Sequence, residues 1–270
     1  TNAAACHLEG FGTVAGVAQG KGELFAGLRA GGTAVINADD PYAPVWRTLS
    51  GERAVIDFGI DTPARVSGAW SGSGAPVSIT TPSWGLTLRL PVPGRHNLAN
   101  ALAATAGAVA AGMAATAVRA GLSAFVPAMG RLAVHSGAEG SRLLDDTYNA
   151  NPGSLDAGLA VLAEADGERW LILGDMGELG DAGADWHAEA GRQAARAGVA
   201  RLWTIGPLSA AAARSFGAGA RHFETLDAIA EAVRAELHAD TTVLVKGSRR
   251  MAMERVVAAL RDQRIIQGGA

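Results

Sequence analysis

The chain has 270 residues, 49% of them hydrophobic and 18% charged, which is typical of a folded globular protein with one large domain or two of ordinary size. Its net charge of −3 and the lack of any basic run argue against a protein that mainly binds nucleic acid or an acidic membrane. The single cysteine, Cys6, excludes an internal disulfide and suits a reducing compartment such as the cytoplasm.

We expect the chain to begin inside a domain, because it has neither an initiator methionine nor a signal-like segment. Short β-branched runs predict two buried strands, at 34–37 and 54–58. Alternating segments predict an antiparallel part of the sheet at 65–90. Alanine-rich helices are expected at 97–111 and 115–124. The uncharged stretch 101–118 is about long enough to cross a membrane. Its Ala, Gly and Thr residues provide little transfer energy and Gly112 interrupts it, so a packed pair of helices is favoured over membrane insertion.

A new alternation of strands and helices follows the stretch 126–130. Apolar strands are expected at 143–144, 170–173, 202–205 and 242–245, and helices near 154–165, 185–198, 207–216 and 225–238, the last capped by Thr225. This pattern predicts a parallel, doubly wound sheet, whose ligands bind at the carboxyl ends of its strands. We therefore expect an α/β fold: a partial central domain with a mixed sheet at 1–128, then a Rossmann-like domain at 129–270.

Polar residues follow three of the predicted strands. Asp145 and Asp146 begin a turn that ends at Ser154, the expected helix cap, and two adjacent carboxylates there need a ribose, an ammonium group or a metal nearby. The alternative is a turn rich in Asx and Pro for local reasons. The strand at 170–173 is followed by a glycine-rich turn containing Asp175. The strand at 242–245 is followed by Lys246 and Arg249, which are expected to form an anion site at the start of the last helix, with Ser248 as its cap.

Lys21 and Lys246 are the only lysines in a chain that otherwise uses arginine, as a GC-rich genome would favour. A lysine amine can lose its proton and be covalently modified, whereas a guanidinium stays protonated. We therefore predict that both positions require lysine for chemical reasons. The glycine-rich segment 16–22 around Lys21 is one residue short of a phosphate loop and has glycine in place of its hydroxyl residue, so we do not expect it to hold phosphate.

Taken together, these motifs resemble one family, the Mur ligases, in the family's order and over almost the whole chain. They are His7–Gly12, Lys21–Glu23, Asn37–Asp40, Gly94–Asn97 with Asn100, Asp146–Ser154, Gly174–Gly180 and Lys246–Arg249. Before the resemblance is considered, Asn97 and Asn100 could equally contact a purine or cap their helix.

The resemblance implies an ATP-dependent ligase of peptidoglycan synthesis, closest to the member that joins D-Ala-D-Ala to UDP-N-acetylmuramoyl-tripeptide through an acyl phosphate, with ATP and Mg²⁺ required. It also implies a cytoplasmic monomer with no nucleic-acid partner. The nearest alternative is the ligase that adds the third residue, but its Asn-Pro-Arg motif is absent here, since Asn151-Pro152 is followed by Gly153.

The resemblance also implies roles for individual residues. His7 and Lys21, the latter as a carbamate, would hold Mg²⁺ and serve catalysis, while Asn97 and Asn100 would contact adenine. Arg131 would contact phosphate and Asp146 the ribose. The residues expected near the peptide substrates are Asn149, Asn151, Asp175, Lys246, Ser248 and Arg249.

The family's phosphate loop and nucleotide-sugar domain would lie before Thr1, so the first 128 residues would be the truncated end of the ATP-binding central domain. We expect these 270 residues alone to hydrolyse no ATP. The rival hypothesis is a non-catalytic fragment that binds nucleotide or peptide.

Overall fold

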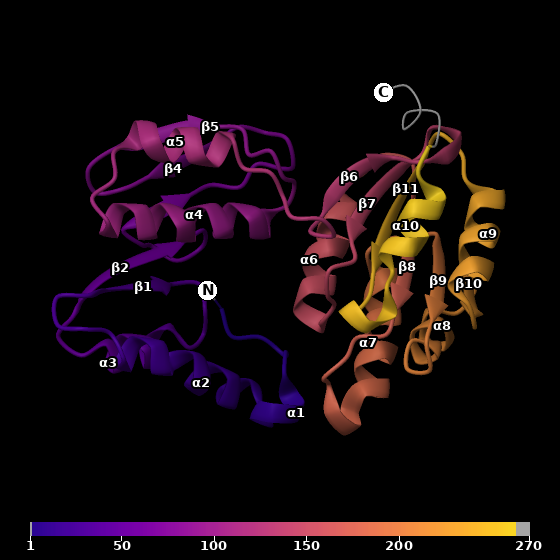
Figure 1. Ribbon diagram of the computed structural model, residues 1–270, viewed down its shortest axis with the longest axis horizontal. Helices are drawn as coiled ribbons and strands as arrows, with labels where there is room; N and C mark the ends of the chain where they lie inside the picture. Colours follow the sequence, from indigo (N-terminus) through magenta and orange to yellow (C-terminus); the bar gives the residue numbers. More distant parts are fainter. Residues whose placement is uncertain (1, 263–270) are drawn as a thin grey trace. The chain divides into compact units, whose positions relative to one another are not determined.

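The computed structural model describes residues 2–262 and divides into two compact units, Thr1–Val126 and Pro127–Ala270 (Figure 1). Both units are α/β, with a sheet of their own and helices packed on it. The α/β fold class expected from the sequence is confirmed, and each unit is described separately below.

The first unit is built on a five-stranded mixed sheet. Its strands lie in chain order: β1 (Thr33–Asn37), β2 (Ala54–Gly59), β3 (Val66–Gly68), β4 (Val77–Thr80) and β5 (Gly85–Leu88). β1, β2 and β3 are parallel, whereas β4 is antiparallel to both of its neighbours. The antiparallel part predicted between residues 65 and 90 is therefore confirmed.

Helices cover both faces of this sheet. They are α1 (Leu8–Phe11), α2 (Val14–Ala26), α3 (Ala43–Ser50), α4 (Arg95–Ala110) and α5 (Ala115–Ser123). In Figure 1, α2 and α3 lie on one side of β1 and β2 and α4 lies on the other, while α5 packs against β5. Leu98 and Leu102 of α4 are fully buried in the core that the strands form. The glycine-rich segment around Lys21 belongs to α2, in agreement with the expectation that it is not a phosphate loop.

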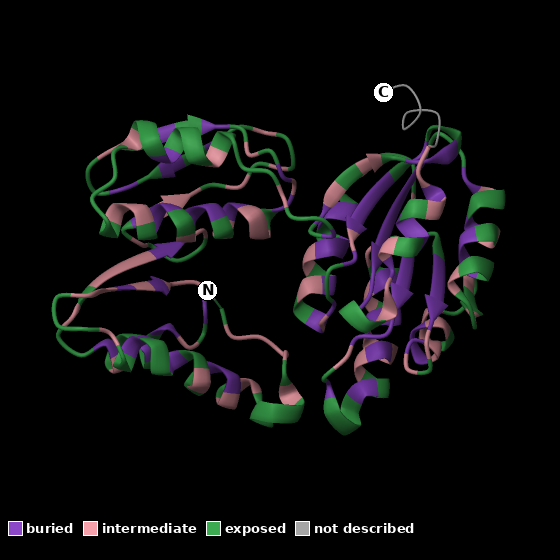
Figure 2. Ribbon diagram, viewed as in Figure 1, coloured by how far each residue is buried: buried purple, intermediate pink, exposed green. Residues whose placement is uncertain are grey.

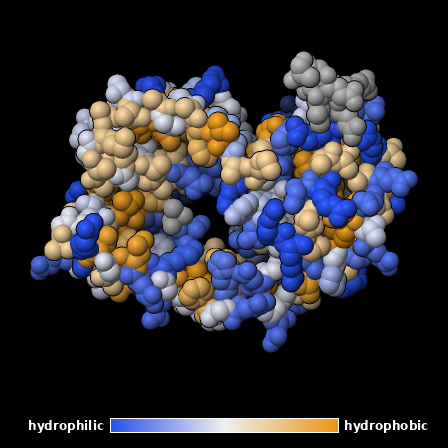
Figure 3. Space-filling view, in the orientation of Figure 1, coloured by the Kyte–Doolittle hydropathy of each residue, from blue (hydrophilic) through white to orange (hydrophobic). Residues whose placement is uncertain are grey.

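The alanine-rich stretch forms two helices, because the chain turns at Gly112, where φ is +73°. Figure 3 shows the surface over α4 and α5 mostly in pale and tan colours, as expected for alanine. Among the described residues, no helix is long and apolar enough to cross a membrane.

The second unit contains a six-stranded sheet in the order β10-β9-β8-β11-β7-β6. The strands are β6 (Ala133–Ser136), β7 (Arg142–Asp146), β8 (Glu168–Gly174), β9 (Arg201–Ile205), β10 (Ala220–Phe223) and β11 (Thr241–Lys246). All neighbours are parallel except β6, which runs antiparallel at one edge. The strand order reverses along the chain, as the doubly wound prediction requires, and β6 and β10 are additions at the two edges.

The helices of the second unit bury both faces of its sheet. They are α6 (Pro152–Ala163), α7 (Gly183–Arg196), α8 (Ala210–Phe216), α9 (Leu226–Glu236) and α10 (Glu254–Leu260). Successive strand residues point to opposite faces, so Leu144 packs in one hydrophobic core and Leu143 in the other. Figure 2 shows the central strands as buried almost throughout. Continuous apolar runs are what a parallel sheet covered on both faces requires.

Two of the predicted caps are wrong and one is right. The cap of α6 is Asn151, whose side chain accepts the Ser154 N–H, while Ser154 at the third helical position bonds back to Asn151 and completes a capping box. Ser248 does not cap the last helix, because a 3₁₀ turn at Arg249–Met251 intervenes and α10 begins after Met253. Thr225 caps α9 as predicted, accepting the Ala228 N–H.

Candidate functional site

The central feature of the second unit is an ion pair between the last residues of two neighbouring strands. Asp146 ends β7 and Lys246 ends β11, and the two are direct partners in the parallel register. Lys246 Nζ lies 2.5 Å from Asp146 Oδ2. Lys246 therefore lies at the end of a strand and not at the helix start that its sequence context indicated.

Strand alternation gives the two adjacent carboxylates separate partners. Asp145 Oδ1 accepts bonds from the backbone N–H and the hydroxyl of Thr147, and its Oδ2 lies 3.6 Å from His135 Nε2. Asp146 faces the ammonium group of Lys246. Of the three partners that the sequence left open for these acids, the structure contains the ammonium group. Neighbours in sequence thus avoid the repulsion that two carboxylates on one face would cause.

The Lys246 side chain is only 1% exposed, so its charge depends on partners inside the protein. Besides Asp146, the amine donates a hydrogen bond to the Asn149 carbonyl, at 3.0 Å. Burial lowers the pKa of Lys246, Asp146 opposes that shift, and Arg131 adds to it. A buried pair of this kind makes the removal of either partner costly.

Arg131 is held against the residues that follow β7. Its guanidinium carbon lies 4.1 Å from the centre of the Tyr148 ring, a cation–π geometry. Gly130, at φ +72°, accepts the Tyr148 N–H through its carbonyl at 2.9 Å. A Cβ at Gly130 would lie only 2.7 Å from the Tyr148 nitrogen, so glycine is needed for this close approach. The turn before Arg131 is therefore fixed on the loop after β7.

These residues surround one pocket of about 200 Å³ at the start of α6. It is lined by Gly130, Arg131, Asp146, Tyr148, Asn149, Asn151, Ser154 and Lys246. Five of the residues selected from the sequence, drawn from segments over 100 positions apart, thus meet at the carboxyl ends of parallel strands. Sequence reasoning did not select Tyr148 or Gly130, and their position beside predicted site residues was the only available signal.

The remaining selected residues of this unit lie outside that pocket. Asp175 is buried, its carboxylate accepts the N–H groups of Leu208 and Ser209, and its carbonyl accepts both the N–H and the hydroxyl of Ser248. Arg249 is exposed and lies 3.3 Å from Glu254. Asp175 and Ser248 therefore link the ends of β8, β9 and β11 to one another.

His187, on α7, holds the glycine-rich turn that follows β8. Its Nε2 accepts the Met176 N–H at 2.8 Å, and its Nδ1 lies 2.6 Å from the Gly183 carbonyl. Nε2 is then the unprotonated nitrogen and Nδ1 the donor. Burial lowers the pKa of this imidazole, which keeps it neutral.

In the first unit, Asn97 and Asn100 lie in the first turns of α4, and neither amide caps the helix. Asn97 Nδ2 donates to the Pro93 carbonyl at 2.6 Å, and Asn100 Nδ2 donates to Asn97 Oδ1 at 3.3 Å. The pair is a turn apart and connected, with Asn100 the more exposed member. Both polar atoms of the Asn97 amide are thus bonded within the chain, and the assignment of Asn97 and Asn100 as adenine contacts stays a prediction.

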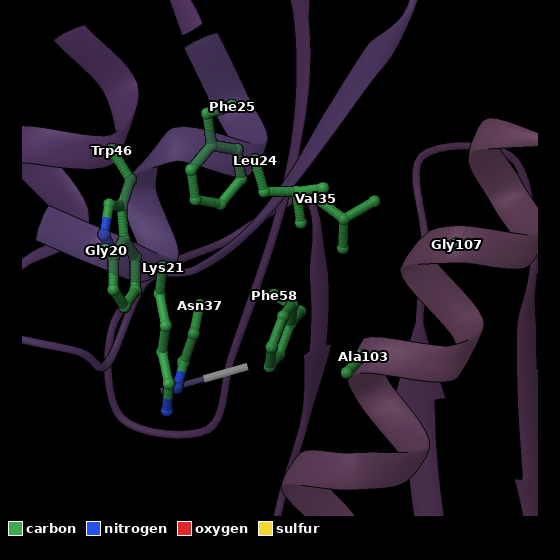
Figure 4. A pocket seen from close by; sticks show the side chains of 10 residues that line it. All are labelled: Gly20, Lys21, Leu24, Phe25, Val35, Asn37, Trp46, Phe58, Ala103 and Gly107. Atoms are coloured by element: carbon green, nitrogen blue, oxygen red, sulfur yellow. The ribbon is translucent and has the colours of Figure 1, made fainter. Parts of the chain in front are cut away.

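Lys21 lies at one end of an apolar cavity of about 540 Å³. Figure 4 shows the side chains of Lys21 and Asn37 converging at that end, with the rings of Phe25, Trp46 and Phe58 along the walls. The Lys21 amine donates a hydrogen bond to the Asn2 carbonyl at 2.8 Å, and the residue is exposed. Its ammonium group has no carboxylate partner in the described chain, in contrast to Lys246.

The described residues do not form a complete magnesium site. His7 precedes α1 in a left-handed conformation, with φ 54°, and the described residues contain no cluster of three His, Cys, Asp or Glu side chains able to hold a metal. Mg²⁺ prefers oxygen ligands, whereas Lys21 here presents an ammonium donor. Only a carbamate on Lys21 would supply oxygens, so the assignment of His7 and Lys21 as metal ligands stays a prediction.

Comparison with known proteins gives consistent matches over nearly the whole chain. Residues 1–108 match the Mur ligase middle domain, and residues 130–249 match the Mur ligase, glutamate ligase domain. The UDP-N-acetylmuramoyl-tripeptide--D-alanyl-D-alanine ligase of Escherichia coli is 40% identical, covering 97% of this chain and 59% of its own length. The Haemophilus influenzae protein of that name is 35% identical over 97% of this chain and 58% of its own.

A solved structure agrees with these sequences. A crystal structure of MurF from Acinetobacter baumannii superimposes with a TM-score of 0.87 and 29% identity, covering 95% of this chain and 57% of that one. The chain therefore spans somewhat more than half the length of the relatives it matches.

Proposed function

Because the chain belongs to the Mur ligase family, we propose that it forms the nucleotide-binding and C-terminal parts of a ligase that joins D-Ala-D-Ala to UDP-N-acetylmuramoyl-tripeptide. The observation that carries the proposal is the pocket in which Arg131 and Asp146 meet beside Lys246. The relatives with this name are longer than the chain, so ligation is proposed for a protein of their length that contains these residues. We also propose that it acts as a monomer in the cytoplasm, where ATP is available.

The proposed reaction has two steps. The γ-phosphoryl group of ATP passes to the terminal carboxylate of the tripeptide, which gives an acyl phosphate and ADP. The amine of D-Ala-D-Ala then attacks the acyl carbon, inorganic phosphate leaves with the bonding electrons, and the amine nitrogen loses a proton. ATP and the tripeptide carboxylate are anionic, and so are the groups that gain charge in both steps, so the reaction needs cationic groups and exact placement more than a protein nucleophile.

The residues of this chain would bind and orient the nucleotide and the peptides. In this proposal Asp146 accepts a hydrogen bond from a ribose hydroxyl, Arg131 contacts a phosphate, and Asn97 and Asn100 contact adenine. Asn149 and Asn151 would contact the peptide substrates at the start of α6, where backbone N–H groups favour carboxylates. Arg249 is exposed enough to reach a carboxylate of the substrates. Asp175 and Ser248 would contribute indirectly, through the hydrogen bond that links the ends of β8 and β11.

Nucleotide binding is tested by titrating ADP into the chain in a calorimeter. We expect wild type to bind and Arg131→Ala to weaken the affinity roughly tenfold, because one charge-assisted contact is lost. Arg142→Ala, at the exposed opposite end of β7, is the matched control and should bind as wild type does. Equal affinities for both variants would remove Arg131 from the site.

The identity of the reaction is tested with the protein that contains these residues at the length of its relatives. Supplied with ATP, UDP-N-acetylmuramoyl-tripeptide and D-Ala-D-Ala, it should form the pentapeptide product, detected by mass spectrometry. Supplied with the dipeptide precursor and a free third amino acid, it should form none. Product only in the second mixture would make it the ligase that adds the third residue.

A further inference from the structure

The Lys246 amine bonds to two separate parts of the pocket at the start of α6. One of its bonds goes to the side chain of Asp146, at the end of β7. The other goes to the Asn149 carbonyl, in the loop that leads from β7 to α6. Since the same loop carries Tyr148, which packs against Arg131, the amine fixes both residues that we assign to the nucleotide.

The two carboxylate oxygens of Asp146 differ in their hydrogen bonding. Its Oδ2 is taken by Lys246, while its Oδ1 accepts no hydrogen bond from the residues that the structure describes, and the side chain is 15% exposed. Asp146 lines the pocket, and anchoring one of its oxygens restricts the side chain while the lone pairs of the other oxygen stay available to a ligand hydroxyl. Lys246, at 1% exposed, leaves almost no surface of its own for such a ligand.

We propose that Lys246 is a positioning residue of the nucleotide site, which acts through Asp146 by anchoring its Oδ2 so that Oδ1 receives a ribose hydroxyl. This inference rests on the proposed function, because it requires that Asp146 meets a nucleotide. It revises the expectation that Lys246 contacts the peptide substrates. The ammonium group contributes to binding without contacting the ligand.

The surroundings explain why lysine is suited to this position in a chain rich in arginine. Leu244 and Gly158 close the space on the α6 side, where a Cβ added at Gly158 would lie 3.0 Å from Leu244 and 3.7 Å from Asp146 Oδ2. An ammonium group is a compact charge, whereas a guanidinium is a wide planar group. The compact ammonium group of Lys246 therefore suits the limited space beside Asp146.

The test measures the affinity of two nucleotides for the chain. ADP carries the ribose hydroxyls, and 2′,3′-dideoxy-ADP lacks them. We expect Asp146→Asn and Lys246→Met each to weaken ADP binding roughly tenfold or more, as for the loss of a charge-assisted hydrogen bond, and to change the affinity for the dideoxy analogue little. The double variant should lose no more than either single variant, because both remove the same interaction.

Val245→Ala is the matched control for loss of stability. Val245 is the neighbouring residue of β11, fully buried in the core on the other face of the sheet. It should lower the melting temperature without changing the preference for ADP over the dideoxy analogue. Lys246→Gln, which keeps a donor at this position, provides a milder second variant if Lys246→Met fails to fold, and should lose part of the same preference.

The outcomes separate the inference from the function on which it rests. If wild type binds no ADP, both fall. If Asp146→Asn loses the preference for ADP while Lys246→Gln and Lys246→Met keep it, only the positioning role is overturned. If Lys246→Met weakens both nucleotides equally, as a purely structural role would, the inference is likewise wrong.

Discussion

The two lysines occupy opposite kinds of environment. Lys246, in the second unit, is buried and paired with a carboxylate, while Lys21, in the first unit, is exposed and bonds to the backbone carbonyl of Asn2. At the strand ends of the second unit, Asp145 and Asp175 are also bonded to internal partners, and His187 on α7 bonds to the turn that follows β8. The rarity of lysine in the sequence thus singled out two positions, but it did not show whether lysine is needed there for its reactivity or for the structure.

Chemical acylation should show this contrast most strongly, because these are the only lysines. With a water-soluble acylating reagent, we expect Lys21 to react at least roughly a hundredfold faster than Lys246, whose reaction requires opening of the β11 end. Peptide mass spectrometry after timed exposure measures both rates. Denatured protein is the control, in which the two rates should converge. Comparable rates in the native protein would contradict the buried position of Lys246.

Removing the amines should give unequal losses of stability. Lys246→Met leaves the Asp146 carboxylate without its partner, so we expect the free energy of unfolding to fall by about 3 kcal/mol in urea titration. Lys21→Met alters an exposed side chain and should change it by less than about 0.5 kcal/mol. Asp146→Asn removes the charge of the other partner and should also lower the free energy of unfolding. A loss of stability in only one of the two variants, Lys246→Met or Asp146→Asn, would argue against a coupled ion pair.

Asp175 offers a second buried carboxylate with a different partner type. Its carboxylate accepts two backbone N–H groups and, among the residues that the structure describes, bonds to no cation. Asp175→Ala should therefore leave the N–H groups of Leu208 and Ser209 without an acceptor and destabilise the protein by about 2 kcal/mol. Denaturant unfolding measures the loss. Asp227→Asn, on an exposed side chain, should be near neutral. A near-neutral Asp175→Ala would mean that this turn does not depend on its carboxylate.

His187 should add a modest dependence of stability on pH. Its pKa is lowered in the folded protein, so below the ordinary value of 6.5 the unfolded chain binds a proton that the folded chain does not. The contribution is complete above pH 6.5 and is lost as the pH falls towards the folded pKa, by at most about 1.4 kcal/mol per pH unit. The contribution of His187 is measured by comparing the free energy of unfolding of wild type and His187→Gln as a function of pH. Parallel curves would show that His187 is not a source of the pH dependence.

Where the sequence carried a periodic signal, its predictions held. The helix at Leu226–Glu236 with its Thr225 cap and the buried central strands were read correctly, since apolar spacing and caps are local features. The helix at Val14–Ala26 was not anticipated, because the glycines around Lys21 are typical of a loop and packing overrides that preference. The edge strands β6 and β10 have four residues each, of which only two are apolar, so they gave no strand signal.

The sequence by itself determined the α/β alternation, the polar groups at the strand ends and their meeting at one edge of a parallel sheet, because these follow from periodicity and from the carboxyl-end rule. Only the tertiary structure decided which of those groups pair. Lys246 and Asp146 are 100 positions apart and meet through strand register, which no local pattern encodes. The exposure of Lys21 and the burial of Lys246 were decided in the same way, since burial depends on what the rest of the chain packs around a side chain.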